Sequence, residues 1–312
     1  MLRCYLTSDT GTMEKAEPTA KGAWIHLTAP TEDELRQVEA ATGVFPDFVR
    51  APLDDEELPR AETDEGQTLI IFNVPILENG SNGDPSYRVL PLGMIIANDR
   101  LITVCLQPHP VLEDFAAGKV KGLHTHKRTR FVFYLLLKAA GLYLRFLDQV
   151  DRRTNEIEDR LMASTRNEEV IRLLQLSKSL TYFTTSLRSN AIVLEKLLKT
   201  KMLPMYPEDE DLLEDAITEN RQAIEVADIH SNILSGTMDA FASIISNNLG
   251  RVLRFLTSVT IVLAIPTIVA SYFGQNLTLP FASHPLAFWF SIGISVVLSV
   301  AAILWLVKKK MF

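Results

Sequence analysis

Acidic side chains concentrate in one short stretch of the chain, directly after Pro207. Seven carboxylates fall within twelve residues: Glu208, Asp209, Glu210, Asp211, Glu214, Asp215 and Glu219. Acidic residues near a helix N-terminus are favoured by the helix dipole. Seven exceed what a helix end needs, and no basic residue lies among them. Because hard divalent cations prefer carboxylate oxygens, the stretch predicts a divalent-cation site, with helix-end stabilisation as the alternative.

A second set of polar residues lies within an uncharged run near the C-terminus. Residues at intervals of three or four share one helical face, and here that face mixes hydroxyl, small and apolar side chains. It comprises Leu253, Leu256, Thr260, Ala264, Thr267 and Ser271. The hydroxyls either bond back to helix carbonyls or line a water-filled path. One helix cannot enclose a pore, so the second interpretation requires an oligomer.

The patterns of common enzymes are absent from the sequence. It contains no P-loop, no G-x-G-x-x-G, no G-x-S-x-G and no H-E-x-x-H. We therefore expect no enzymatic activity. The formal charge of −7 makes nucleic acid an improbable partner. Two cysteines without a paired spacing and no signal peptide predict that the charged part lies in the cytoplasm.

Two uncharged, mostly apolar runs end the chain, at 255–273 and 286–307. A helix of roughly 20 such residues crosses a bilayer, so both runs predict transmembrane helices. Basic residues favour the cytoplasmic side of a membrane. They flank the pair of runs at Arg251, Arg254, Lys308, Lys309 and Lys310. The sequence predicts a multi-pass protein of the plasma (inner) membrane with both termini in the cytoplasm, an external loop at 274–285 and a basic tail at 308–312.

The remainder reads as an α+β cytoplasmic domain, a mixed sheet with helices. Residues 1–120 combine short β-branched runs with a helix at 31–42, which Thr31 and Glu34 can cap. Residues 121–207 predict a long antiparallel helical pair, and 208–254 a stalk helix that continues into the first span. A helix from 208 to 273 would be about 100 Å long, so it would connect the cytoplasmic domain to the membrane.

Several segments of the chain resemble the motifs of one known protein family. The end of the first span, Tyr272-Phe273-Gly274-Gln275-Asn276, is similar to the family's aromatic residue followed by Gly-Met-Asn. The stretch 233–257 resembles the stalk that enters the pore helix. Near the N-terminus, Trp24-Ile25-His26-Leu27, followed by 30–35, is similar to the W-I-D-L…P-T-x-E-E-L signature. The matches run in family order along the chain, and together they resemble the CorA family of magnesium transporters.

The resemblance implies a funnel-shaped homopentamer whose first transmembrane helices line the pore. Its selectivity motif would be Gly274, Gln275 and Asn276, with the Asn276 amides in a ring at the outer mouth. The pore-lining residues would be Gly250, Leu253, Leu256, Thr260, Ala264, Thr267 and Ser271, of which Leu253 and Leu256 match a dewetting gate. Asp215, with Asp211 and Glu208 beside it, matches a regulatory cation site. Mg²⁺ would be both cargo and regulator, without a resident cofactor.

Three departures from the family pattern bear on the ion carried. Gln275 replaces methionine, Gly250 stands where asparagine is frequent, and the external loop has no acidic residue. The leading hypothesis is transport of Mg²⁺, with Co²⁺ and Ni²⁺ as further candidates, gated by cytoplasmic divalent cations. A Zn²⁺ transporter like the ZntB branch is one alternative. A membrane-anchored sensor or scaffold that conducts nothing is another.

Overall fold

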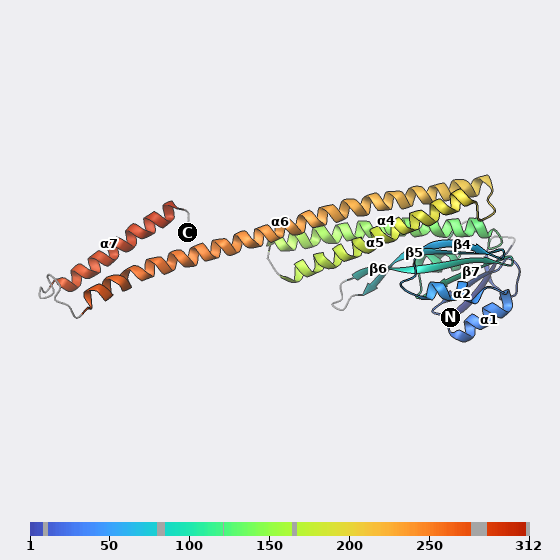
Figure 1. Cartoon of the computed structure of the whole chain (residues 1–312), viewed down its shortest axis with the longest axis horizontal. Helices are drawn as coiled ribbons and strands as arrows, with labels where there is room; N and C mark the ends of the chain where they lie inside the picture. Colours follow the sequence, from blue (N-terminus) through green and yellow to red (C-terminus); the bar gives the residue numbers. More distant parts are fainter. Residues whose placement is uncertain (9–11, 80–84, 121, 164–166, 276–285, 310–312) are drawn as a thin grey trace. The chain divides into compact units, whose positions relative to one another are not determined.

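The computed structural model describes residues 1–8, 12–79, 85–120, 122–163, 167–275 and 286–309. The chain divides into two compact units, Met1–Gly236 and Thr237–Phe312. The first contains a sheet covered by helices, and the second contains two apolar helical segments (Figure 1). The longest helix, α6 (Pro207–Phe273), contributes residues to both units.

A seven-stranded sheet forms the centre of the first unit, in the order β2-β1-β3-β7-β6-β5-β4. Its β3 and β7 pair in parallel, while the other neighbours are antiparallel, which confirms the predicted mixed sheet. The strands are β1 (Leu2–Thr7), β2 (Met13–Lys15), β3 (Trp24–Thr28), β4 (Arg60–Asp64), β5 (Gln67–Asn79), β6 (Pro85–Ala97) and β7 (Arg100–Cys105). The short edge strands β2 and β4 were not predicted from the sequence.

One face of the sheet packs on α1 (Glu32–Thr42), α2 (Pro46–Arg50) and the 3₁₀ helix η1 (Ala51–Leu53). Alternate residues of β3 point to opposite faces, so Ile25 and Leu27 join this apolar core. The predicted capping box of α1 is present: Thr31 Oγ1 accepts from the Glu34 amide, and Glu34 Oε2 accepts from the Thr31 amide at 2.9 Å. A Cβ at Gly93 would lie 2.1 Å from Pro52 Cγ, so only glycine lets η1 approach β6.

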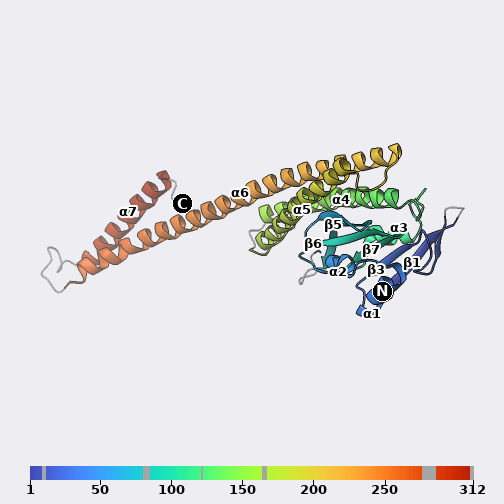
Figure 2. The same ribbon diagram turned by 45° about the vertical axis from the view of Figure 1, so that its right-hand side comes forward.

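The other face packs on α4 (Arg128–Ala163) and α5 (Asn167–Thr200), the predicted long pair, with the short α3 (Pro110–Ala116) beside them (Figure 2). Strand β4 begins at Arg60, opposite Ile71, so the backbone of Asn73 has no strand partner on that side. The Asn190 amide of α5 supplies one, accepting from Asn73 N at 2.9 Å and donating to Asn73 O at 2.8 Å. This pairing attaches α5 to the sheet.

Helix α6 begins in the first unit and packs there on α4 and α5. Its buried residues recur every three or four positions, as an amphipathic helix requires: Leu213, Ala216, Asn220, Ala223 and Ala227. Asn220 Nδ2 donates to the Leu187 carbonyl of α5 at 3.0 Å. The helix continues without a break to Phe273, which confirms the predicted stalk helix that runs into the first apolar span.

The second unit consists of the last part of α6 and α7 (Ala287–Lys308), which lie beside each other in both views (Figures 1 and 2). Among the described residues, α6 and α7 are the helices long and apolar enough to cross a membrane. Most of their large apolar side chains are exposed. Such surfaces need lipid or another protein surface to cover them.

Candidate functional site

The acidic stretch at the start of α6 contains an internal counter-ion that the sequence pattern did not reveal. Arg130 of α4 reaches it, with Nη2 2.6 Å from Glu208 Oε2 and Nε 2.7 Å from Asp209 Oδ1. Hydrogen bonds to Glu208 and Asp209 raise the pKa of the Arg130 guanidinium. Lys201 Nζ lies 3.6 Å from Glu210. The expectation of carboxylates without a nearby base is therefore wrong for these three, because their cations come from elsewhere in the chain.

Asp209 is the buried member of this group and caps the helix. Its side chain is 5% exposed, and its Oδ2 accepts from the Tyr206 amide at 3.1 Å. Pro207 occupies the first helical position, where its missing amide N–H costs nothing. Part of the acidic stretch thus has a structural role, because Asp209 caps the N-terminus of α6. Glu208, beside it, is held by Arg130.

Of the other four carboxylates of the stretch, Glu219 is half-buried, and three lie on the outer face of α6: Asp211, Glu214 and Asp215. All three are exposed, and within the described residues none forms an ion pair. The described residues contain no group of three or more His, Cys, Asp or Glu side chains that could hold a metal ion. A cation bound by Asp211 or Asp215 would therefore need further ligands from outside this chain. We call these three residues the acidic turn.

The predicted pore stripe lies on the uncovered side of α6. Leu253, Leu256, Thr260, Thr267 and Ser271 are exposed, while Ala264 and Gly250 are half-buried. A second stripe is covered instead, with Ser258 and Val269 buried and Val262 and Ile265 half-buried. At about 3.6 residues per turn the two stripes lie on roughly opposite sides of the helix. The hydroxyl-bearing face is thus free to meet other copies or water.

Two hydroxyls of this face bond to their own helix. Thr260 Oγ1 donates to the Leu256 carbonyl at 2.9 Å, and Thr267 Oγ1 donates to the Leu263 carbonyl at 3.3 Å. Back-bonding is one of the two interpretations that the sequence left open for these hydroxyls. The other is that they line a water-filled path. Each hydroxyl oxygen keeps lone pairs that can accept a hydrogen bond from water. Back-bonding therefore satisfies the donors without removing the stripe as a polar surface.

The predicted selectivity motif begins where α6 ends, at Gly274. Gly274 N donates to the Ala270 carbonyl at 2.9 Å, and a Cβ at Gly274 would lie 3.1 Å from that same oxygen. The close approach explains a glycine here. Gln275 follows and is exposed, whereas Asn276, the predicted selectivity residue, lies outside the described residues.

The basic flanks predicted to fix the orientation lie within α6, just before its apolar segment, and at the end of α7. Arg251, Arg254, Lys308 and Lys309 are exposed, and Lys310 lies outside the described residues. None of the four described cations forms an ion pair with another described residue. Their charges are therefore available to a membrane surface, and the positive-inside rule continues to predict that this surface is cytoplasmic.

A large α+β part followed by two C-terminal apolar helices, with a hydroxyl-bearing stripe on the first, defines a membrane protein of the transporter type. Residues 19–310 match the family of the CorA-like Mg²⁺ transporter protein. The chain belongs to this family. The family consists of transporters, which agrees with the expectation that the chain is not an enzyme.

The relatives agree with this membership over most of their length. The cobalt/magnesium transport protein CorA of Methanocaldococcus jannaschii is 30% identical over 286 residues, 88% of this chain and 86% of the relative. The complete structure of that organism's CorA magnesium transporter superposes with a TM-score of 0.82 at 26% identity, covering 97% of this chain and 96% of the other. The ZntB cytoplasmic domain of Vibrio parahaemolyticus shares the fold, with a TM-score of 0.60 at 16% identity, covering 80% of this chain and 97% of that domain.

Proposed function

We propose that this chain assembles into a homopentameric, channel-like transporter that passes Mg²⁺ through the membrane, with Co²⁺ and Ni²⁺ as further cargo. The observation that carries the proposal is the exposed stripe of α6, which lies opposite the covered one. Five such stripes facing one axis would enclose a path that a single helix cannot. The relative from M. jannaschii is a cobalt/magnesium transport protein, and its similarity supports the same cargo here.

Selection would take place at the motif after α6. Magnesium gives up its bound water reluctantly, so a ring of neutral amide oxygens from Asn276 can hold the hydrated ion without stripping it. Selectivity then depends on ring size and acceptor geometry. Gln275 adds a second amide beside each Asn276. Both residues would face the outer mouth of the pore.

A gate would lie near the cytoplasmic end of the same stripe. Leu253 and Leu256 are exposed, apolar and one turn apart. Rings of such side chains exclude water and block ions by dewetting. Gly250 lies one turn earlier and has no side chain, so the pore would be wider at its cytoplasmic end, where ions exit. The hydroxyls of Thr260, Thr267 and Ser271 would line the wetter section beyond the gate.

Regulation would use the acidic turn together with Glu208. Carboxylates of neighbouring subunits repel one another unless a cation lies between them. Divalent ions bound at Asp215, with Asp211 and Glu208 nearby, would therefore hold the subunits together in the closed state. Loss of these ions at low internal Mg²⁺ would let the subunits separate and open the gate. This arrangement makes uptake dependent on the internal Mg²⁺ concentration.

The decisive experiment measures ion flux into proteoliposomes with ion-sensitive dyes. We expect Mg²⁺ entry from the wild-type chain, loss of that entry in Asn276→Ala, and near-normal entry in the neighbouring control Thr278→Ala. Proton-coupled Zn²⁺ movement without Mg²⁺ entry would instead support the ZntB-like alternative. If no divalent ion crosses, transport is excluded and a sensor or scaffold role remains.

A further inference from the structure

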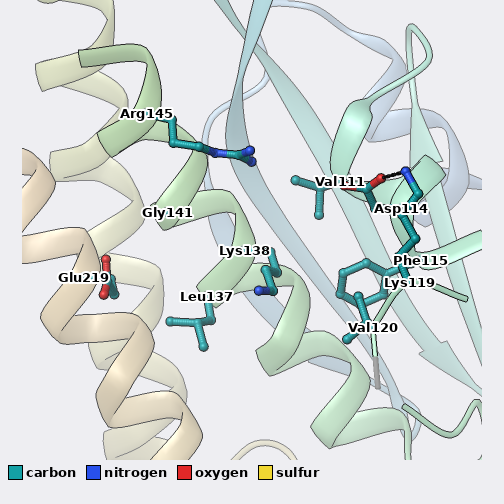
Figure 3. Close-up of a pocket in the computed structure, with 10 residues that line it drawn as sticks. All are labelled: Val111, Asp114, Phe115, Lys119, Val120, Leu137, Lys138, Gly141, Arg145 and Glu219. Atoms are coloured by element: carbon teal, nitrogen blue, oxygen red, sulfur yellow. Dashed lines mark hydrogen bonds and ion pairs between the residues drawn. The ribbon is translucent and has the colours of Figure 1, made fainter. Parts of the chain in front are cut away.

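A pocket of about 480 Å³ in the first unit lies against α3, α4 and α6 (Figure 3). Apolar side chains from α3 and α4, among them Val111, Phe115 and Leu137, form part of its wall. Lys138 and Arg145 of α4 also line it, and Asp114 and Lys119 close one side with a 2.6 Å ion pair. The pocket therefore combines an apolar lining with an excess of positive charge.

The two cations of α4 have no acidic partner of their own. The side chains of Lys138 and Arg145 form no ion pair or hydrogen bond with any described residue, although this chain carries a net charge of −7. Glu219 of α6 lines the same pocket but is not paired with either. Figure 3 shows the side chain of Arg145 extending from α4 away from Glu219. Both side chains are exposed, so a negative group from another copy of the chain can reach them.

Gly141 lies between them and leaves the pocket open. It stands three residues after Lys138 and four before Arg145, so all three share one face of α4. A Cβ at Gly141 would meet no atom within 4 Å, and glycine within a helix costs about 1 kcal/mol relative to alanine. Packing inside this chain therefore does not require glycine at this position, and the space beside it is open to a group from outside the chain.

We propose that the acidic turn of a second copy of this chain docks on this pocket, so that its carboxylates pair with Lys138 and Arg145. The charges are complementary: Asp211, Glu214 and Asp215 are exposed and unpaired among the described residues. The acidic turn and the pocket are different surfaces of one chain, so the contact can repeat head-to-tail from copy to copy. Head-to-tail contacts form a closed ring where the rotation between copies closes, as it does in the homopentamer on which this inference rests.

The pairing has a consequence for regulation. The carboxylates of the acidic turn then have two possible counter-charges, a divalent ion or the fixed cations of the neighbouring subunit. Lys138 and Arg145 supply a part of the subunit contact that needs no metal. Divalent ions strengthen a ring that already holds together, instead of being its sole support.

The test measures the oligomeric state of the full-length protein in detergent by native mass spectrometry, in EDTA and in Mg²⁺. We expect the wild-type ring to survive EDTA. In Lys138→Gln/Arg145→Gln the dissociated fraction in EDTA should rise at least about tenfold, a change of about 1.4 kcal/mol, and Mg²⁺ should restore the ring. The matched control Arg152→Gln/Arg160→Gln removes two exposed charges from the same helix and should behave as wild type.

Two further variants separate docking from folding. Gly141→Leu projects a side chain into open space in the single chain and should weaken the ring while leaving amide hydrogen exchange in the sheet unchanged. Lys138→Glu/Arg145→Glu should dissociate the ring in EDTA, and adding Asp211→Lys/Asp215→Lys in the same chain should restore it. A Lys138→Gln/Arg145→Gln ring as stable in EDTA as wild type would overturn the inference while leaving transport standing. A wild-type protein that is monomeric in Mg²⁺ would instead overturn the proposed pentamer itself.

Discussion

Two buried histidines are held neutral in the sheet unit. His109 Nε2 donates to the Pro75 carbonyl at 3.2 Å, and its Nδ1 accepts from the Val111 amide at 3.3 Å, which caps α3. His26, in the position of the aspartate of the family signature, lies between the hydroxyls of Thr28 and Thr103. Burial lowers the pKa of each imidazole to about 4.

These pKa values predict acid sensitivity of the sheet. Below a pH of about 6.5 the unfolded chain binds a proton at His109 that the folded chain refuses until about pH 4. Stability is therefore complete above this window and falls as the pH decreases through it, by up to about 3 kcal/mol. His109→Gln keeps a donor for Pro75 but cannot titrate. Hydrogen exchange of β5 and β7, measured at about pH 7 and about pH 5, should show a smaller loss of protection in this variant. An equal loss would contradict the assignment.

Gly274 offers a second test at this scale. A methyl group there would lie 3.1 Å from the Ala270 carbonyl oxygen, closer than ordinary contact, so the turn must shift by a few tenths of an ångström. This shift would displace Gln275 and the proposed ring residue after it. We expect Gly274→Ala to lower Mg²⁺ flux several-fold. Gly293→Ala in α7, where a Cβ meets nothing within 4 Å, is the control and should retain wild-type flux.

At the scale of elements, Arg130 connects the N-termini of α4 and α6. It pairs with the buried Asp209 and the exposed Glu208 across 79 and 78 residues of chain. A buried carboxylate without its cation costs far more than an exposed one. The position at which α6 begins, and with it the orientation of the acidic turn, therefore depends on a residue of α4.

Arg130→Gln should accordingly destabilise the first unit by about 2 kcal/mol, because Asp209 loses its charged donor. Arg128→Gln, which removes a partner of the exposed Asp99, should cost less than about 1 kcal/mol. Denaturant titration of the full-length protein, followed by hydrogen exchange in residues 205–220, distinguishes the two. If both variants lower the free energy of unfolding by similar amounts, the burial of Asp209 does not make its pairing with Arg130 more stabilising than an exposed ion pair.

At the scale of the whole molecule, the proposed ring places sensing and conduction on the same helix. The acidic turn lies at the start of α6, and the hydroxyl-bearing stripe lies near its end. In an assembly of several copies, a cation bound between neighbouring acidic turns would hold together the same α6 helices that form the proposed pore. Coupling of the two sites needs only that α6 stay one continuous helix, as it does from Pro207 to Phe273.

Asp215→Ala should therefore raise flux at high internal Mg²⁺, because the closed state loses a ligand of its regulatory ion. Flux at low internal Mg²⁺ should change little, since the site is then empty in both proteins. Asp47→Ala, an exposed carboxylate of α2 in another part of the first unit, serves as the control. Inhibition by internal Mg²⁺ that is the same in Asp215→Ala and wild type would exclude Asp215 from the regulatory site.

Local patterns in the sequence were sufficient for features that depend on neighbouring residues. The capping box of Thr31 and Glu34, the long helix into the first span and the two apolar helices all follow from short spacings or composition. Only the tertiary structure could pair Arg130 with Asp209, or place β3 beside β7 across 77 residues, because such contacts leave no short-range signal. It also decided which stripe of α6 is covered and which is exposed. Packing makes that choice, whereas helical periodicity shows only that both stripes exist.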